Sequence, residues 1–265
     1  MSPSEAVASR LRGLLEAGEK PWPAPIEHHE AIGSTSDRLK AWAREGAPEL
    51  AVVLADTQTA GRGRQGRTWA SPPGNLCVSV LLAPAQRHAA LMPLLGGVAT
   101  CAALASLGAS ARLKWPNDVL AGEKKLAGVL AEASAGPRGV DWVALGIGAN
   151  VDPQDKLPEN ATSLRAETGR VESPVAVAAV VLAQVRLWYH ALASGEAKGL
   201  LAAWRDRSVP WWGLLVVAAV GDQVIRGSAT DIDDDGALLL ELEDGRLQRV
   251  ISGEVSRVRL AAEVD

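Results

Sequence analysis

Apolar positions recur along the chain with two different periods. They lie three or four residues apart in residues 4–17 and 175–193, which is the spacing of helices that bury one side. A third helix of about ten residues is expected after Ser34 or Ser36, either of which is a suitable N-cap. Shorter apolar runs with the length of strands lie at residues 50–55, 76–82, 113–120, 128–132 and 142–151. We therefore predict a domain that mixes helices and strands.

The segment from Ala89 to Ala111 contains no charged residue and is long enough to raise the alternative of a membrane span. Its glycines, its proline and its many Ala, Ser and Thr residues favour membrane insertion only weakly. We interpret this segment as a helix buried in the protein core, and we expect no contact with a membrane.

The pattern changes after Pro210. Short β runs at residues 214–220, 224–232, 237–242 and 247–251 are separated by Gly-Asp or Asp-Gly turns. Such a series is typical of a small SH3-like β-barrel. We predict an N-terminal helix and proline-rich linker at 1–25, a main domain at 26–209 and an SH3-like C-terminal domain at 210–265.

Charge is distributed unevenly. The net charge is −4, which argues against general affinity for nucleic acid. From Thr57 to Asn117, however, there is no Asp or Glu, and six Lys or Arg residues give this segment a positive potential. A bound anion is indicated. The chain has two cysteines, Cys77 and Cys101, in no metal-binding or disulfide-rich spacing, so a reducing cytoplasm fits best and no metal site is expected within the protein.

Residues 57–69 read TQTAGRGRQGRTW, with three glycines and three arginines in seven positions. Glycine lets the backbone approach a ligand closely, and arginine offers forked donors to phosphate or carboxylate. The letters match a dinucleotide-binding fingerprint, but the prolines at 72 and 73 and the absence of a later acidic residue argue against it. A solvated surface loop is the alternative.

A second group of polar residues is formed by KWPND at 114–118 and KKLAG at 124–128. A turn near residues 121–124 would place Asp118 and Lys125 on the same face of a hairpin. They could then line one pocket, although an ordinary surface ion pair is the alternative on spacing alone.

Taken in chain order, these segments resemble the biotin–protein ligase family. The motifs that carry the resemblance are Gly-Ser-Thr at 33–35, GRGRQGR at 61–67, KWPND at 114–118, KLAG at 125–128, GIGANV at 146–151 and GEVS at 253–256. The resemblance covers about residues 30–260. It implies an α+β fold with a mixed central sheet flanked by helices, as in class II aminoacyl-tRNA synthetases, and an SH3-like C-terminal barrel.

The resemblance also implies roles for individual residues, with ATP and biotin as substrates and Mg²⁺ as the accompanying ion. The catalytic group would consist of Lys125, Asp118 and Arg64. Biotin would be bound by Ser34, Thr35, Ser36, Gln58, Arg62, Gly63, Arg64, Lys125 and Gly128. The nucleotide would be bound by Arg62, Arg64, Arg67, Trp69, Lys114, Asn117 and Asn150, with the glycine–arginine loop acting as a lid over the adenylate.

The implied partner is a biotin carboxyl carrier protein or domain, and the protein would be a monomer or a homodimer. Only about 30 residues precede the Gly-Ser-Thr turn, so we expect a ligase without a DNA-binding helix-turn-helix. Two alternatives stay open. One is a lipoate–protein ligase-like enzyme, and the other is a biotin-binding regulator without catalytic activity.

Overall fold

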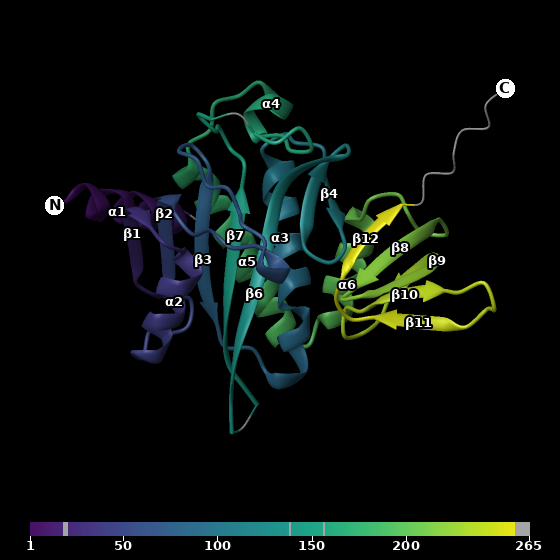
Figure 1. Ribbon diagram of the computed structural model, residues 1–265. Helices are drawn as coiled ribbons and strands as arrows, with labels where there is room; N and C mark the ends of the chain where they lie inside the picture. The colour runs from purple at the N-terminus through teal and green to yellow at the C-terminus, as the bar shows by residue number, and fades with distance from the viewer. Residues whose placement is uncertain (18–20, 138, 156, 258–265) are drawn as a thin grey trace.

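A computed structural model describes residues 1–17, 21–137, 139–155 and 157–257, which form two sheets and the helices that cover them (Figure 1). The elements in chain order are α1 (Pro3–Glu16), β1 (Ile26–Ile32), α2 (Thr35–Arg44), β2 (Val52–Gln58), the 3₁₀ turn η1 (Arg64–Gly66), β3 (Leu76–Leu82), η2 (Gln86–Leu91), α3 (Met92–Ser106), β4 (Ala111–Lys114), β5 (Asp118–Ala121), β6 (Lys124–Gly136), β7 (Gly139–Ala149), α4 (Leu164–Thr168), α5 (Pro174–Ala193), α6 (Ala197–Arg207), β8 (Leu215–Val220), β9 (Gln223–Ile232), β10 (Leu238–Glu241), β11 (Leu247–Val250) and β12 (Glu254–Arg257).

The larger sheet has seven strands in the order β1-β2-β3-β7-β6-β5-β4. Only β1 and β2 are parallel, and every other neighbouring pair is antiparallel. The predicted strand at 76–82 is β3, and all seven of its residues are buried. Strand β1 was not expected, because Glu and His residues fill its middle and hide the alternation of an edge strand.

The prediction of a single strand at 113–120 is wrong. The segment is an antiparallel hairpin in which Leu113 pairs with Val119 and Lys114 pairs with Asp118. Residues 115–117 form its turn, and the bond between Trp115 and Pro116 is cis. Pro116 has no N–H to donate to a neighbouring strand, so a strand cannot continue through it with all its hydrogen bonds. The chain turns at this position instead.

Helices cover both faces of the seven-stranded sheet. Helices α3 and α5 pack on one face and enclose the main core, while α2 covers the other face over a smaller core that includes Leu39, Val53 and Leu81. A Cβ atom on Gly96 would lie 2.7 Å from Val129 Cγ1, so glycine lets α3 approach the sheet closely.

The charge-free segment forms the buried helix α3, which is shorter than the predicted range. Residues 86–106 and helix α5 are long and apolar enough to cross a membrane by length and composition alone. Within the protein, 67% and 44% of these two windows are buried, and the core helix of a soluble protein passes the same test. The expectation of no membrane contact therefore stays a prediction.

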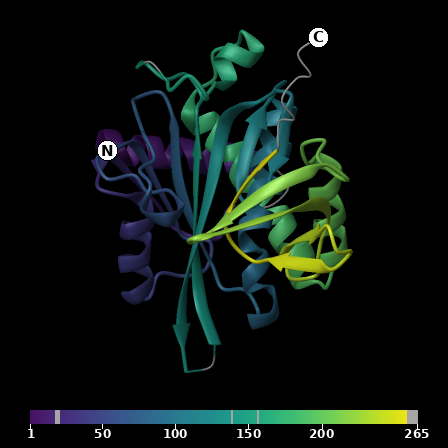
Figure 2. The same cartoon turned by 45° about the vertical axis from the view of Figure 1, so that its right-hand side comes forward.

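The smaller sheet is antiparallel throughout, with the order β11-β10-β9-β8-β12 (Figure 2). It includes four of the predicted short strands and a fifth, β12, so the fold predicted from the sequence is confirmed at this level. The sheet is joined to the larger one by a hydrogen bond from Trp115 Nε1 to the carbonyl of Gly236, at 3.0 Å. Residues 18–20 and 258–265, parts of the linker and of the C-terminal domain, lie outside the described residues, and the boundary near Pro210 stays a prediction.

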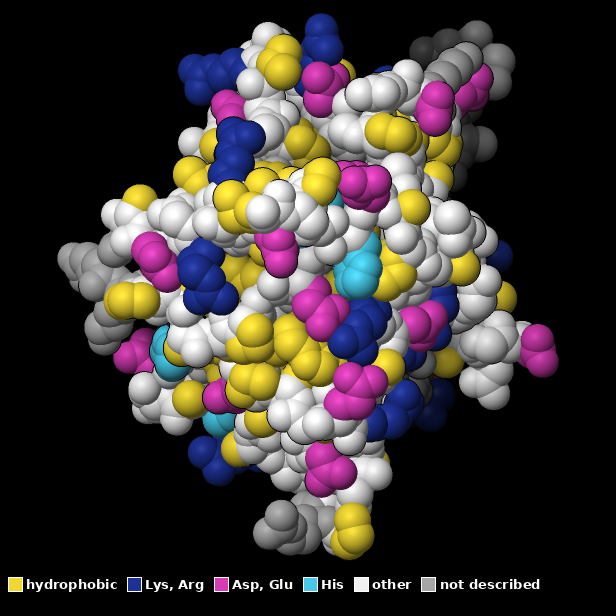
Figure 3. All heavy atoms as spheres, turned by 90° about the vertical axis from the view of Figure 1, so that its left-hand side faces the viewer, with side chains coloured by type: hydrophobic (Ala, Val, Ile, Leu, Met, Phe, Trp, Pro, Cys, Tyr) yellow, Lys and Arg dark blue, Asp and Glu magenta, His cyan; other side chains and the backbone are white. Residues whose placement is uncertain are grey.

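Figure 3 shows the face of the molecule on the side of α1, β1 and α2. Acidic and basic side chains are interspersed over this face, with apolar side chains between them. A mixed distribution of this kind creates no strong field of one sign. The concentration of positive charge indicated by the sequence lies elsewhere, around a cavity.

Candidate active site

A cavity of about 400 Å³ lies between the larger sheet, the glycine–arginine loop at 61–67 and strand β12 of the smaller sheet. Every site residue predicted from the sequence lines it. These residues are Ser34, Thr35, Ser36, Gln58, Arg62, Gly63, Arg64, Arg67, Trp69, Lys114, Asn117, Asp118, Lys125, Gly128 and Asn150. They come from six different segments, so the fold has brought together groups that are up to 116 positions apart, from Ser34 to Asn150.

One end of the cavity is neutral. Gln58 Oε1 accepts hydrogen bonds from the backbone N–H of Thr35, at 2.8 Å, and from its hydroxyl, at 3.1 Å. Gln58 Nε2 donates to Ser71 Oγ at 3.0 Å. Ser34 occupies the N-cap position of α2, but its side chain makes no capping hydrogen bond. We call Ser34, Thr35, Ser36, Gln58 and the groups bonded to them the hydroxyl–amide end.

Trp69 forms one wall of the cavity because two glycines make room for it. Gly128 in β6 and Gly148 in β7 are paired across the sheet. A Cβ atom on Gly148 would lie 2.5 Å from the indole of Trp69, and one on Gly128 would lie 3.3 Å from it. The buried indole nitrogen has no hydrogen-bond partner among the described residues. The indole is therefore held by packing against the sheet and by its neighbours.

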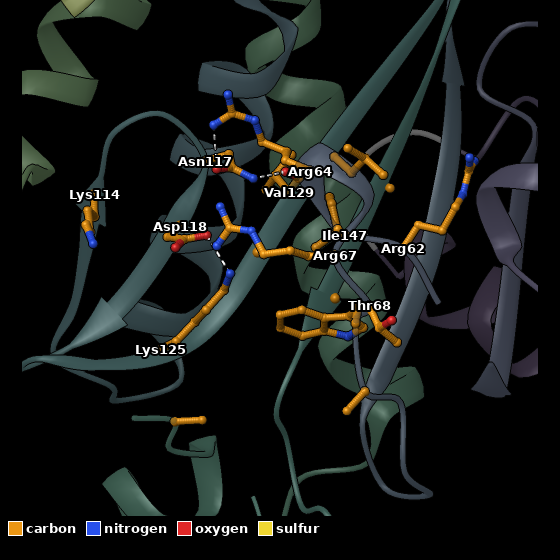
Figure 4. Close-up of a pocket in the computed structure, with 18 of the residues that line it drawn as sticks. Arg62, Arg64, Arg67, Thr68, Lys114, Asn117, Asp118, Lys125, Val129 and Ile147 are labelled. Carbon is orange, nitrogen blue, oxygen red and sulfur yellow. Dashed lines mark hydrogen bonds and ion pairs between the residues drawn. The ribbon is translucent and has the colours of Figure 1, made fainter. Parts of the chain in front are cut away.

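Lys125 and Asp118 meet across the β5–β6 hairpin, as the sequence predicts. Their side chains form an ion pair of 2.7 Å inside the cavity (Figure 4), with exposed fractions of 33% and 26%. The ammonium also lies 5.3 Å from the ring centroid of Trp69, a cation–π contact. This pair lines a cavity that an arginine loop borders, so it is more than an isolated surface ion pair.

The glycine–arginine loop is a folded hairpin. The backbone N–H of Gly63 donates to the carbonyl of Arg67 at 2.7 Å, and that of Trp69 donates to Gly61 at 2.9 Å. A Cβ atom on Gly61 would lie 2.5 Å from the carbonyl oxygen of Trp69, so only glycine allows this close return. Gly66 has a φ of 73°, in the left-handed region. The segment therefore has a defined backbone conformation, while Arg62, Gln65, Gly66 and Arg67 are exposed at the surface.

Arg64 points from the loop toward Asn117 in the β4–β5 turn (Figure 4). Its Nη1 donates to Asn117 Oδ1 and to the carbonyl of Gly253, each at 3.3 Å. Asn117 is held in turn by a hydrogen bond from its Nδ2 to the carbonyl of Val129, at 2.5 Å. Burial lowers the pKa of the Arg64 guanidinium, and the nearby Asp118 carboxylate raises it. The guanidinium stays charged, because arginine does not lose its proton in proteins.

The other two loop arginines are held at opposite sides. Arg67 forms an ion pair of 2.9 Å with Glu254 of β12. Arg62 points away from the other two (Figure 4) and is paired with Asp37 and Glu132, at 2.7 Å each. The Arg62 guanidinium therefore has two carboxylate partners on α2 and β6, while its backbone borders the cavity.

Lys114 and Asn150 differ in how far their side chains are engaged. Lys114 forms no ion pair with any of the described residues, which leaves its ammonium available to a ligand. The Asn150 amide donates to the carbonyls of Lys125 and Thr162, at 3.4 and 2.9 Å, and accepts a hydrogen bond from Asn75. Asn150 therefore fixes the backbone beneath Lys125. We call Arg64, Arg67, Lys114 and Lys125 the cationic end.

Sequence reasoning missed several groups that complete the site. Ser71 and Ser79 support the hydroxyl–amide end, and Glu132 and Glu254 pair with the loop arginines. Glu254 belongs to the GEVS motif at 253–256, which was noticed for the resemblance without a role. Among the described residues, no group of three or more His, Cys, Asp or Glu side chains could hold a metal ion.

Comparison with known proteins identifies a family. Residues 29–152 match the model of the biotin/lipoate A/B protein ligase family, and residues 216–258 match the biotin protein ligase C terminal domain. A biotin–[acetyl-CoA-carboxylase] ligase of Mycobacterium tuberculosis is 36% identical over 242 residues, which cover 86% of this chain and 86% of that protein. The corresponding enzyme of Paracoccus denitrificans is 35% identical over 80% of this chain and 93% of its own length.

A bifunctional ligase/repressor of Bacillus spizizenii is 32% identical over 86% of this chain but only 72% of its own length. Among solved structures, a biotin protein ligase from Aquifex aeolicus in complex with biotin and ATP is similar, with a TM-score of 0.76 and 30% identity. That match covers 88% of this chain and 99% of the other. Both the sequence relatives and the fold place this chain in one family. It belongs to the biotin–protein ligase family.

Proposed function

We propose that this protein activates biotin with ATP to biotinyl-5′-AMP and pyrophosphate, and then transfers biotin to a lysine of a biotin carboxyl carrier protein or domain. One observation carries the proposal: a single cavity joins a neutral hydroxyl–amide end to a cationic end. Biotin has an uncharged ureido head and a carboxylate tail. Such a cavity would bind the head by hydrogen bonds and hold the tail where the phosphates of ATP meet it.

In the first step, an oxygen of the biotin carboxylate attacks the α-phosphorus of ATP, and the bond to the pyrophosphate oxygen breaks. Lys125 is suited to stabilise the negative charge that develops on the α-phosphate oxygens, because Asp118 and the Trp69 ring hold its ammonium in place. Arg64 would bind the biotin carboxylate and the α-phosphate. Arg67 would bind the departing phosphates once it leaves Glu254.

The remaining predicted nucleotide contacts have supporting arrangements. Lys114 lines the cavity and has no ion-pair partner among the described residues, Trp69 offers its ring, and Asn117 and Asn150 hold Arg64 and the backbone of Lys125. Mg²⁺ would arrive with ATP and neutralise phosphate charge, since magnesium is commonly held by substrate phosphates and one or two carboxylates. The carboxylates that line the cavity are those of Asp118, Glu123 and Glu254.

In the second step, the neutral amine of the carrier lysine attacks the carbonyl of the mixed anhydride and AMP leaves. Asp118 would orient that amine and accept its proton. The folded glycine–arginine loop, held on both sides by its arginines, would keep water from the adenylate during this step.

We also expect the protein in the cytoplasm, as a monomer or homodimer without bound nucleic acid. Both cysteines are free and buried, which is compatible with a reducing compartment. The described residues before β1 comprise the helix α1 and a short non-helical segment at 21–25.

The proposal is tested by incubating the purified protein with ATP, Mg²⁺, biotin and an apo carrier domain, and detecting product with streptavidin. The matched control is the same carrier with its acceptor lysine replaced by arginine. We expect biotinylated carrier only with the intact lysine. Tight biotin binding without product would instead identify a binding regulator, and labelling with lipoate in place of biotin would identify the lipoate-ligase alternative.

A further inference from the structure

Ser79 is a polar residue in the middle of β3, a strand whose residues are all buried. It does not line the cavity, yet its hydroxyl lies 2.8 Å from Thr35 Oγ1 and 3.1 Å from Ser36 Oγ. A buried hydroxyl is costly unless it is hydrogen-bonded. Both of its partners belong to the hydroxyl–amide end of the cavity, so Ser79 connects two groups that face the ligand.

The backbone N–H of Thr35 determines which group donates in each of these hydrogen bonds. The backbone N–H of Thr35 can only donate, so the amide atom that faces it must be the oxygen of Gln58. The nitrogen of the same amide then faces Ser71 and donates to its hydroxyl. This orientation of Gln58 leaves its oxygen as the acceptor for the Thr35 hydroxyl as well.

The remaining protons follow from counting, because each hydroxyl has a single proton to donate. Thr35 gives its proton to Gln58, so at the Thr35–Ser79 contact Ser79 must be the donor. Ser79 has then used its only proton, so at the second contact Ser36 must donate to Ser79. The reverse direction would set two lone pairs against each other between Thr35 and Gln58. The chain therefore runs from Ser36 through Ser79 and Thr35 to Gln58.

This direction determines what the cavity offers a ligand. The protons of Ser36 and Thr35 are turned toward their protein neighbours, so both oxygens present lone pairs to the cavity. The Gln58 amide nitrogen is engaged by the protein, since it donates to Ser71 Oγ and the side chain also interacts with the buried Cys77 thiol. The wall therefore offers hydroxyl oxygens as acceptors. A cyclic urea, whose two N–H groups are donors, is complementary to this arrangement.

We propose that Ser79 is a positioning residue that sets the direction of the hydroxyl chain and thereby selects a ureido head group. This inference rests on the proposed function, in which biotin is the ligand. Gly146 supports the arrangement, because a Cβ atom there would lie 2.6 Å from Ser36 Oγ and would push that hydroxyl out of line. A head group without N–H donors would leave the Ser36 and Thr35 oxygens unpaired, which penalises its binding.

The first experiment measures biotin affinity by titration calorimetry for the wild-type protein and Ser79→Ala. Loss of the directing hydroxyl should weaken binding of biotin and of desthiobiotin, which keeps the ureido group, by the same factor of about tenfold. The adenylation kcat should stay within about twofold of wild type, since the group acts on binding alone. Val78→Ala, in the same strand but facing the main core, controls for general loosening and should leave both affinities unchanged.

The second experiment is a double-mutant cycle with Ser36→Ala. If Ser79 acts through Ser36, the two substitutions together should weaken biotin binding clearly less than the product of their separate effects. Additive effects, or an unchanged affinity in Ser79→Ala, would overturn the inference while leaving the ligase proposal intact. Failure of the wild-type protein itself to bind biotin would instead overturn the proposed function. Melting temperatures of all variants identify any that fail to fold, and Ser79→Cys, which keeps size and a weak donor, should then show a smaller loss of affinity than Ser79→Ala.

Discussion

The two ends of the cavity are built in opposite ways. At the hydroxyl–amide end, neutral side chains form a continuous hydrogen-bonded chain, and Thr35, Ser36 and Ser79 are each less than a tenth exposed. At the cationic end, the side chains of Lys125 and Arg67 are 33% and 55% exposed, and each is paired with a carboxylate. The neutral end is already satisfied internally, whereas at the cationic end Arg67 must exchange Glu254 for the phosphates when they arrive.

This difference suits the hydroxyl–amide end to binding the ligand and the cationic end to the reaction. A buried neutral network loses little on ligand binding, because its groups keep their partners and add the ligand to their unused sites. Exposed ion pairs contribute little to stability, so exchanging a carboxylate for a phosphate costs little. We therefore expect substitutions at the cationic end to change rates, and substitutions around the neutral end to change affinity.

The largest expected effect is that of Lys125→Ala. Removing the ammonium should lower the rate of biotinyl-AMP formation by about a hundredfold or more, because its contact strengthens as charge develops on the α-phosphate. Biotin affinity should change by less than about threefold. Pyrophosphate release and titration calorimetry measure the two quantities. Lys124→Ala, whose side chain is exposed and lies outside the cavity, is the matched control. Equal losses in rate and affinity would show that the two ends are not separate.

Next in size is Arg64→Gly, which removes the contacts to Asn117 and Gly253 and the anchor for the adenylate. Biotinyl-AMP should leave the protein about tenfold faster or more, because a charge-assisted hydrogen bond to phosphate is lost. The released adenylate should label lysines of added albumin, which streptavidin blotting detects. Arg170→Gly, beyond α4, should label no more albumin than wild type. Retention of the adenylate at the wild-type rate would contradict the assignment of Arg64.

A smaller effect is expected from Gly148→Ala. The added Cβ would lie 2.5 Å from the Trp69 indole and must displace that wall of the cavity. Biotin should bind several-fold more weakly, and the midpoint of thermal unfolding should fall, since overpacking of this kind costs about 1–3 kcal/mol. Gly13→Ala in α1, where a Cβ meets nothing within 4 Å, should instead raise stability slightly. Unchanged biotin affinity in Gly148→Ala would mean that Trp69 is not part of the binding wall.

The smallest effect concerns the thiols. Burial raises the pKa of Cys101 to about 11 and also raises the pKa of Cys77, which lies beside Ser71 and Gln58. Both should react slowly with iodoacetamide at pH 8, by mass spectrometry of the intact protein. Above the ordinary thiol pKa of about 8.5, the unfolded chain loses protons that the folded chain keeps, so stability should decline between there and about pH 11. If the neutral end is rigid, biotin should not slow alkylation of Cys77 relative to Cys101.

The local pattern of apolar and polar residues predicted those helices and strands whose own sequence carries a clear hydrophobic pattern. Strand β3 is an almost continuous apolar run, helices α1 and α5 carry apolar residues at helical spacing, and the prediction of all three elements is confirmed. Strand β1 and helix α6 were missed, because polar residues within them obscure the pattern and their burial depends on distant segments. Residues 113–120 form two strands because a turn lies inside the apolar run, and hydrophobic periodicity alone does not reveal such a turn.

The site likewise contains residues that the sequence identifies and residues that only the folded structure reveals. Arg64 could be assigned from the sequence because the glycine–arginine loop indicates anion chemistry, whereas Lys125 was assigned through the family resemblance of its motif; both line one cavity. Their roles stay predictions. Ser79 could not be found in this way, since a single serine in an apolar strand has no distinctive spacing. Glu132 and Glu254 meet the loop only after the chain has folded, so their pairing is a tertiary property.

The paired glycines under Trp69 have a consequence for altering this protein. Because the indole nitrogen has no partner among the described residues, a smaller apolar side chain at position 69 would leave no polar group stranded. The space released would lie between the flat backbone of β6–β7 and the cavity, beside Gly128 and Gly148. A biotin analogue enlarged on that side could occupy it. Substitutions at position 69 could therefore adapt the cavity to enlarged biotin analogues for orthogonal labelling. The hydroxyl chain would still bind the urea of such an analogue.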